Sequence, residues 1–284
     1  MRREVERLFD AMAHSYDELE PWYEHLYTVL HAILRAELEP RDGHRPCALD
    51  AGCGSGFQSA LLEDLGYETH GVDISPALLA LARRRLQRST LTRASIEALP
   101  YRDHCFDAVC CCGSTLSFVE APGQALLEFG RVLRPGGTLL LECEHKWSLD
   151  LAWALVSSLT FDSLGYGVSP VDVWRLLARP LAEGIELDYP GYGTLRLYTL
   201  SELGAMLRDA GLTTLRLRGI HTITNLIPST VLHRARLGRP LARLYRWLRI
   251  LDRALVPFSP AARLANSVVI VARKDGVVRG TNPR

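Results

Sequence analysis

The sequence has almost no lysine: Lys146 and Lys274 stand against thirty-one arginines. It also has almost no net charge, +1 at pH 7, so no overall field attracts nucleic acid or an anionic lipid surface. The arginines are scattered along the chain, and we interpret their excess as a compositional bias. With 48% hydrophobic and 23% charged residues over 284 positions, the composition is that of a globular protein with one large domain.

Targeting and metal-binding patterns are absent as well. The N-terminus MRREVERLFD lacks the apolar segment of a signal peptide, and the apolar run at residues 149–159 is too short to span a bilayer. The seven cysteines include three in succession, Cys110 to Cys112, but no C-x-x-C pair and no zinc-type Cys/His spacing. We therefore expect no metal site, reduced cysteines that pack as small apolar residues, and a cytoplasmic location.

What the sequence does have is a repeated alternation of short apolar runs and amphipathic stretches. Alternating strands and helices with short connections predict a parallel sheet covered on both faces. AVCCC and LLLECE are almost continuously apolar, which is typical of buried parallel strands. Breaks in the alternation divide the chain. The expected parts are an N-terminal helical cap (1–45), an α/β core (46–146), an insertion that forms a lid and includes the loop DYPGYGTLRLY (147–198), a core helix and strand (199–220), a second insertion with a basic amphipathic helix (221–265), and a last core strand and tail (266–284).

Three glycines at every second position, Gly52, Gly54 and Gly56, follow the first expected strand. Such a turn places backbone N–H groups and the positive end of a helix around a ligand. Its spacing differs from the G-x-G-x-x-G of dinucleotide-binding proteins. Asp50 stands directly before the loop, where it would repel a pyrophosphate and attract an ammonium or sulfonium group.

A second carboxylate, Asp73, ends the next expected strand, seventeen residues after Gly56. A carboxylate at this place can accept hydrogen bonds from both hydroxyls of a ribose. The loop and the two aspartates together indicate an adenosine-type ligand with a cationic end and no phosphate. S-adenosylmethionine has this chemistry.

Four stretches in order resemble the motifs of class I S-adenosylmethionine-dependent methyltransferases: LDAGCGSG, GVDIS, RASIEALPYRDHCFDAV and RVLRPGGTLLLE. The resemblance runs from about residue 9 to 144 and resumes over 199–220 and 266–274. It implies a Rossmann-like α/β fold with a seven-stranded, mostly parallel sheet and helices on both faces, an N-terminal helical cap and two mainly helical insertions. It also implies S-adenosyl-L-methionine as the cofactor.

The resemblance assigns cofactor contacts by motif position. The glycine loop would contact the methionine part, Asp73 the ribose, and residues 95–97 the adenine, where Ser95 stands in place of a frequent acid so that either Ser95 or Glu97 accepts from the amino group. FDAMAHSYDEL resembles an N-terminal segment that folds over the cofactor. The expected cofactor-binding residues are Asp50, Gly52, Cys53, Gly54, Ser55, Gly56, Asp73, Ile74, Ser95, Ile96, Glu97, Cys112, Gly113 and Tyr16.

Methyl transfer from a sulfonium needs alignment above all, and it needs a base only when the acceptor must lose a proton. Open α/β sheets bind their ligands at the carboxyl ends of the strands. The catalytic candidates are His145, Glu144 and Tyr16; the substrate-binding candidates are Ser114, Thr115, Trp147, Tyr192 and His221. A packing histidine and a solvated carboxylate are the alternatives for His145 and Glu144.

The second insertion holds seven arginines and one acid between Arg234 and Arg253. Its leucines share one helical face, with Tyr245 and Trp247 at the border. A basic amphipathic helix of this kind can lie in a membrane interface, so residues 234–256 are a candidate for peripheral contact with the inner face of the membrane. An ordinary lid helix with solvated arginines is the alternative.

We expect a methyltransferase that acts on a small organic acceptor, with apolar or lipid-like molecules favoured. DNA is not expected, because CGSTLSF stands where the (N/D)-P-P-(Y/F) signature of amino-base methylation would follow the fourth strand. RNA is disfavoured, because no RNA-binding module accompanies the arginines. Methylation of RNA or protein remains the nearest alternative, and an NAD(P)-dependent oxidoreductase the more distant one.

Overall fold

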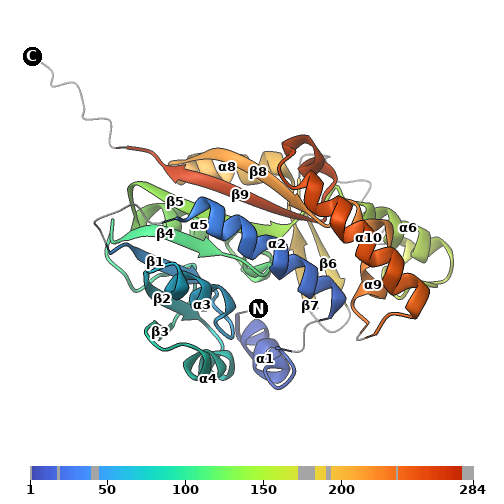
Figure 1. Cartoon of the computed structure of the whole chain (residues 1–284), viewed down its shortest axis with the longest axis horizontal. Coiled ribbons are helices and arrows are strands. Elements are labelled where there is room, and N and C mark those ends of the chain that lie inside the picture. The colour runs from blue at the N-terminus through green and yellow to red at the C-terminus, as the bar shows by residue number, and fades with distance from the viewer. Residues whose placement is uncertain are drawn as a thin grey trace, which may run out of the picture.

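The computed structural model describes residues 2–17, 20–39, 45–171, 183–189, 193–234 and 236–276. A seven-stranded sheet with the order β3-β2-β1-β4-β5-β9-β8 forms its centre (Figure 1). The strands are β1 (Cys47–Ala51), β2 (Glu68–Asp73), β3 (Thr90–Arg93), β4 (Phe106–Cys111), β5 (Leu133–Glu144), β8 (Leu212–Ile220) and β9 (Ser267–Lys274).

Only β9 runs against its neighbours in this sheet; it pairs antiparallel with both β5 and β8, whereas the other pairs are parallel. This confirms the expected mostly parallel, Rossmann-like sheet. The reversal has a consequence for function. The beginning of β9 lies at the same edge as the carboxyl ends of β1, β2, β4 and β5.

Helices cover both faces of the sheet, as expected. The helices are α2 (Pro21–Glu37) and α3 (Phe57–Asp64) on one face, and α5 (Pro122–Val132) and α8 (Leu200–Asp209) on the other. The three consecutive cysteines show why the strands are apolar throughout: Cys110 and Cys112 pack under α2, whereas Cys111 packs toward α5. All seven cysteines are free thiols.

The two N-terminal helices occupy different positions in the fold. Helix α2 packs its buried leucines directly on the sheet and so belongs to the core. Helix α1 (Arg2–Met12) instead lies beside α4 (Pro76–Arg85) (Figure 1). Ser75 caps α4 through a 3.1 Å hydrogen bond from the Leu78 N–H to its hydroxyl oxygen, as a serine followed by proline predicts.

The two insertions gather at one end of the molecule (Figure 1). The first contains α6 (Leu149–Leu159) and an antiparallel hairpin of β6 (Ile185–Tyr189) and β7 (Gly193–Leu197). The expected loop over DYPGYGTLRLY is therefore wrong for residues 188–189 and 193–197, which lie in these two strands. Alternate residues of the hairpin, among them Leu187 and Leu195, are buried, and this two-residue period was masked by the flanking glycines.

The second insertion contains α9 (Ser229–Leu232) and α10 (Arg239–Leu255), with short 3-10 turns at Thr224–Leu226 and Ser259–Leu264. The buried face of α10 is made by Tyr245, Leu248 and Asp252. In the described part of the chain, no helix is both long enough and apolar enough to cross a bilayer.

Candidate functional site

The glycine loop between β1 and α3 is held by the strand beside it. The N–H groups of Gly52 and Cys53 both donate to the carbonyl oxygen of Val72, at 2.7 and 2.9 Å. Gly52 has φ +79°, and a Cβ there would lie 2.2 Å from the side chain of Thr115. Only glycine fits at this position, because both the backbone conformation and the space exclude a side chain.

Two buried aspartates flank this loop. The Asp50 carboxylate accepts a 2.5 Å hydrogen bond from the Ser59 hydroxyl, and burial raises the pKa of Asp50 to about 7, with the nearby Asp73 adding to the effect. Asp73 accepts from the N–H groups of Gly54 and Ser75, at 2.8 and 2.9 Å, and burial raises its pKa as well. A cationic ligand beside them would favour their charged forms, and an anionic one would oppose them.

A narrow pocket opens next to Asp73. Its polar rim includes Ser95, whose hydroxyl donates to Glu97 at 3.1 Å, while Glu97 also accepts from the Ala121 N–H at 2.7 Å. The pocket is lined by Val5, Phe9, Tyr16, Gly52, Asp73, Ile74, Leu78, Ala94, Ser95, Ile96, Glu97, Gly113, Thr115, Phe118, Val119 and Glu120. An apolar slot with a carboxylate at its edge and a close-approaching glycine loop fits the adenosine of S-adenosylmethionine.

Six of the expected cofactor residues do not line this pocket: Asp50, Cys53, Gly54, Ser55, Gly56 and Cys112. Cys53 and Cys112 are buried, and Gly56, with φ +88°, directly precedes α3. Thr115 was expected on the acceptor side, but it lies in the wall of the narrow pocket, with its hydroxyl donating to the Cys112 carbonyl oxygen at 2.9 Å.

The N-terminal segment closes over the pocket and is anchored at several points. Asp17 accepts from the Ser55 hydroxyl at 2.7 Å and pairs with Arg85 at 2.7 Å. Asp10 accepts from the Ser75 hydroxyl at 2.5 Å. Tyr16 lies so close to the loop that a Cβ on Gly54 would be 3.2 Å from its hydroxyl oxygen.

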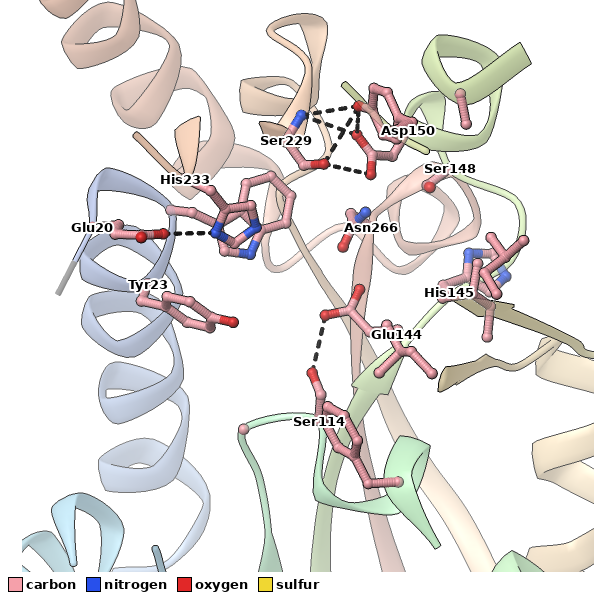
Figure 2. Close-up of a pocket in the computed structure, with 18 of the residues that line it drawn as sticks. Glu20, Tyr23, Ser114, Glu144, His145, Ser148, Asp150, Ser229, His233 and Asn266 are labelled. Carbon is pink, nitrogen blue, oxygen red and sulfur yellow. Dashed lines mark hydrogen bonds and ion pairs between the residues drawn. The ribbon is translucent and has the colours of Figure 1, made fainter. Parts of the chain in front are cut away.

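A larger cavity of about 540 Å³ adjoins the narrow pocket (Figure 2). Its walls come from α1, α2, the end of β5, both insertions and the start of β9. It is lined by Phe9, Met12, Ser15, Tyr16, Glu20, Trp22, Tyr23, Tyr27, Gly113, Ser114, Phe118, Glu144, His145, Ser148, Asp150, Leu151, Ala154, Tyr166, Val168, Leu187, Leu195, Leu197, Ser229, His233 and Asn266. Phe9, Tyr16, Gly113 and Phe118 line both spaces, so the two are neighbours along this boundary.

Ser114 links two carboxyl groups of β5 at the cavity wall. Its N–H donates to Glu142 at 2.8 Å, and its hydroxyl donates to Glu144 at 2.9 Å. Burial raises the pKa of Glu142, and burial together with Glu142 raises the pKa of Glu144 well above its usual value. The ionised form of Glu144 is therefore a stronger base than an ordinary carboxylate, which is a property of a group that can take a proton from an acceptor.

His145 also lines the cavity, but it is a weak base. Burial lowers its pKa to about 4, and its Nδ1 lies 3.2 Å from the Ala265 carbonyl oxygen, to which it donates as a neutral ring. Two other expected substrate residues lie outside the cavity lining: Trp147, and His221, which is buried in a stack with Trp22 at 3.6 Å between ring centroids. Tyr192 lies outside the described residues.

The structure adds lining residues that the sequence analysis did not single out. Tyr27 lies beside the shared boundary, since a Cβ on Gly113 would be 3.5 Å from its hydroxyl oxygen. At the far end, Asp150 accepts from the hydroxyls of Tyr166 and Ser229, at 2.5 and 2.7 Å. Asn266 directly precedes β9. Because β9 is antiparallel to β5, its start lies at the carboxyl end of β5, and the position of Asn266 could have been inferred from this direction.

Within the ranges that the structure describes, no group of three histidine, cysteine, aspartate or glutamate side chains could hold a metal ion.

Comparison with known proteins agrees with this geometry. Residues 49–141 match the family model described as a methyltransferase domain. The chain is 36% identical over 163 residues to malonyl-[acyl-carrier protein] O-methyltransferase of Halorhodospira halophila, a match that covers 55% of this chain and 54% of that protein. It is 30% identical over 144 residues to demethylmenaquinone methyltransferase of Chlorobaculum parvum, covering 48% and 58%. The chain thus matches a little over half the length of these relatives.

Solved structures show the same fold. The 1,6-didemethyltoxoflavin-N1-methyltransferase of Burkholderia thailandensis superposes with a TM-score of 0.53 at 18% identity, covering 97% of this chain and 91% of that one. An S-adenosylmethionine-dependent methyltransferase of Mesorhizobium loti gives a TM-score of 0.54 at 18% identity, covering 86% and 96%. The sheet order, the glycine loop and the paired aspartates agree with the methyltransferase domain matched at residues 49–141, and the chain has the α/β fold of S-adenosylmethionine-dependent methyltransferases.

Proposed function

We propose that the protein transfers the methyl group of S-adenosylmethionine to a small organic acceptor with an apolar or lipid-like body. One observation carries the proposal: the pocket that fits an adenosine and the 540 Å³ cavity share a boundary at Gly113, Tyr16 and two phenylalanines. Donor and acceptor would meet across that boundary. The apolar wall of the cavity, which includes Leu151 and Leu187, suits an acceptor of the proposed kind.

The residues have separable roles in this proposal. S-adenosylmethionine supplies the electrophilic methyl group when it is bound. Asp73 and the glycine loop hold the donor, and Tyr16 covers it, so that the methyl group and the acceptor stay aligned and water is excluded. Glu144 is the proposed proton acceptor, because its raised pKa makes it a stronger base than His145.

Calorimetry with S-adenosylhomocysteine tests the cofactor half of the proposal. The purified protein should bind this product, and Asp73→Ala should weaken binding by about 100-fold, because a charge-assisted hydrogen bond contributes roughly 1.5–3 kcal/mol and Asp73 also orders the loop. Asp64→Ala, an exposed aspartate of α3, is the matched control and should bind normally. Absence of heat with the wild-type protein would contradict the proposal.

We further propose that α10 brings the protein to an anionic membrane surface, where a lipid-like acceptor would be found. Leu244, Trp247 and Leu251 lie on one exposed stripe of α10, with Trp247 69% exposed. An exposed row of arginines runs beside the stripe: Arg239, Arg243, Arg246 and Arg253. An apolar stripe beside basic residues suits the boundary between headgroups and acyl chains.

Vesicle sedimentation tests this second proposal. The protein should bind vesicles rich in phosphatidylserine more strongly than phosphatidylcholine vesicles, and Arg243→Gln/Arg246→Gln should lose roughly tenfold, at about 1 kcal/mol for each arginine near the surface. Arg102→Gln/Arg208→Gln removes two exposed charges elsewhere and should change little. Binding to an acidic carrier protein and not to vesicles would assign α10 to a protein partner and overturn the membrane proposal.

A further inference from the structure

The described lining of the larger cavity contains carboxyl groups but no lysine or arginine. The carboxyl groups are those of Glu20, which pairs with His233 at 2.9 Å, Glu144 and Asp150; Ser114 links Glu144 to the buried Glu142. The imidazole of His145 is neutral at pH 7, because burial lowers its pKa to about 4. A wall of this composition favours a ligand that donates hydrogen bonds or carries positive charge, and it opposes a carboxylate or phosphate.

Asn266 gives an independent indication of what the ligand offers. The residue is 6% exposed, and its Oδ1 atom has no hydrogen-bond partner among the residues that the structure describes. Figure 2 shows Asn266 and Glu144 extending into the same part of the cavity, with the Asp150 cluster beyond. An unpaired buried carbonyl oxygen is unfavourable, and a hydrogen bond from a ligand N–H or O–H would remove that cost.

Glu144 is positioned to accept a hydrogen bond from the same ligand group. One of its oxygens accepts from the Ser114 hydroxyl at 2.9 Å, and Ser114 is in turn fixed by the hydrogen bond from its N–H to Glu142. No second hydrogen bond is needed to orient the carboxyl group. Burial and the neighbouring Glu142 raise the pKa of Glu144, so a positive charge arriving nearby would stabilise its ionised form.

The opposite wall of the cavity is aromatic. The rings of Tyr23 and Tyr27 on α2 are stacked, with 6.3 Å between centroids and 26° between planes, and Phe9 and Phe118 meet edge to face at 5.1 Å. Aromatic faces attract cations and pack well against flat apolar groups. The two walls together fit a molecule with a nitrogen at one end and an apolar or aromatic body.

We propose that the acceptor is an amine with an apolar or aromatic body, whose nitrogen donates hydrogen bonds to Asn266 and Glu144. This inference rests on the methyl transfer proposed above. The lone pair of the neutral amine forms the new carbon–nitrogen bond, and the carbon–sulfur bond breaks with its electron pair left on sulfur. The ammonium product then gives one proton to the Glu144 carboxylate. A carboxylate acceptor would meet no lysine or arginine in the described lining, and the imidazole of His233 is already paired with Glu20.

Three probes with a shared phenyl body and different end groups test the inference: 2-phenylethylamine, 2-phenylethanol and 3-phenylpropionate. Calorimetric titration of the protein saturated with S-adenosylhomocysteine should show the amine binding at least tenfold more tightly than the acid, with the alcohol between them. Glu144→Gln and Asn266→Leu should each weaken amine binding about tenfold and leave the affinity for S-adenosylhomocysteine unchanged. Glu68→Gln, an exposed change at the start of β2, is the matched control.

Asn266→Asp is a second variant at this position, for the case that Asn266→Leu unfolds the protein. It keeps the size of the side chain and adds negative charge, so it should increase the ratio of amine to acid affinity. Equal binding of the three probes, tighter binding of the acid, or unchanged amine binding in Glu144→Gln would overturn the inference. Failure of the wild-type protein to bind S-adenosylhomocysteine would instead remove the proposed function, so the two failures are distinguishable.

Discussion

The narrow pocket and the larger cavity are built in different ways. The pocket comes mainly from strand ends and loops that follow one another between residues 50 and 120, with α1 as its cover. The cavity collects side chains from Phe9 to Asn266, including both insertions. Recognition of the cofactor is thus encoded in short, continuous motifs, whereas recognition of the acceptor depends on segments that only folding brings together.

The two spaces also differ in how their polar groups are satisfied. In the pocket, Asp73 and Glu97 both accept hydrogen bonds from backbone N–H groups of neighbouring loops. In the cavity, the Oδ1 atom of Asn266 has no hydrogen-bond partner within the described part of the chain. The pocket is ordered before its ligand arrives, and the cavity leaves part of its hydrogen bonding to the acceptor.

The largest expected effect concerns the charge beneath the pocket. The pKa of Asp50 is about 7 in the folded protein and about 3.9 in an unfolded chain, so its contribution to stability is complete below pH 4 and is lost as pH rises to 7. The variant Asp50→Asn has no charge to bury, so it should not lose stability in this way as pH rises. At pH 8 its free energy of unfolding should exceed that of the wild type by up to about 4 kcal/mol. Urea denaturation of both proteins without cofactor at pH 4 and pH 8 measures the difference in unfolding free energy. If that difference is the same at the two pH values, burial of the Asp50 charge is not its cause.

A second change tests whether the pocket depends on one glycine. Gly52→Ala should weaken S-adenosylhomocysteine binding roughly 100-fold, because about 1–2 kcal/mol of left-handed strain adds to the overlap with Thr115. Adding Thr115→Ala to Gly52→Ala should restore only part of the lost affinity, because the backbone strain at residue 52 remains. Gly238→Ala, where a Cβ meets nothing within 4 Å, is the control. Normal binding by Gly52→Ala would show that the loop tolerates a different path.

The smallest effect should be confined to the cavity. Tyr166→Phe removes one hydrogen bond to Asp150, so the melting temperature should fall by about 2–4 °C, which corresponds to roughly 1 kcal/mol. Affinity for S-adenosylhomocysteine should stay within about twofold, because Tyr166 does not line the pocket. A large loss of cofactor affinity would mean that the two spaces are coupled through the first insertion.

The sequence patterns that point to the pocket are local. The end of a strand, a glycine turn and a helix cap involve residues within a few positions of one another, as at Asp50, Gly52 and Ser75. The β6–β7 hairpin was missed because its strands are short and the sequence between them is rich in glycine and proline. In α10, Leu244 and Leu251 share a helical face with Leu248, but of these three only Leu248 is buried, which the sequence pattern could not specify.

The amino-acid sequence by itself determined the strand and helix order, the glycine loop and the carboxylates at the ends of β1 and β2, because periodicity and backbone strain act over a few residues. Tertiary structure alone decided that Tyr27, Asp150 and Asn266 face one cavity. Those three residues lie on α2, α6 and the start of β9, and nothing in their separate neighbourhoods specifies the contact. Their meeting follows from the reversed direction of β9 and from the packing of α2 on the sheet.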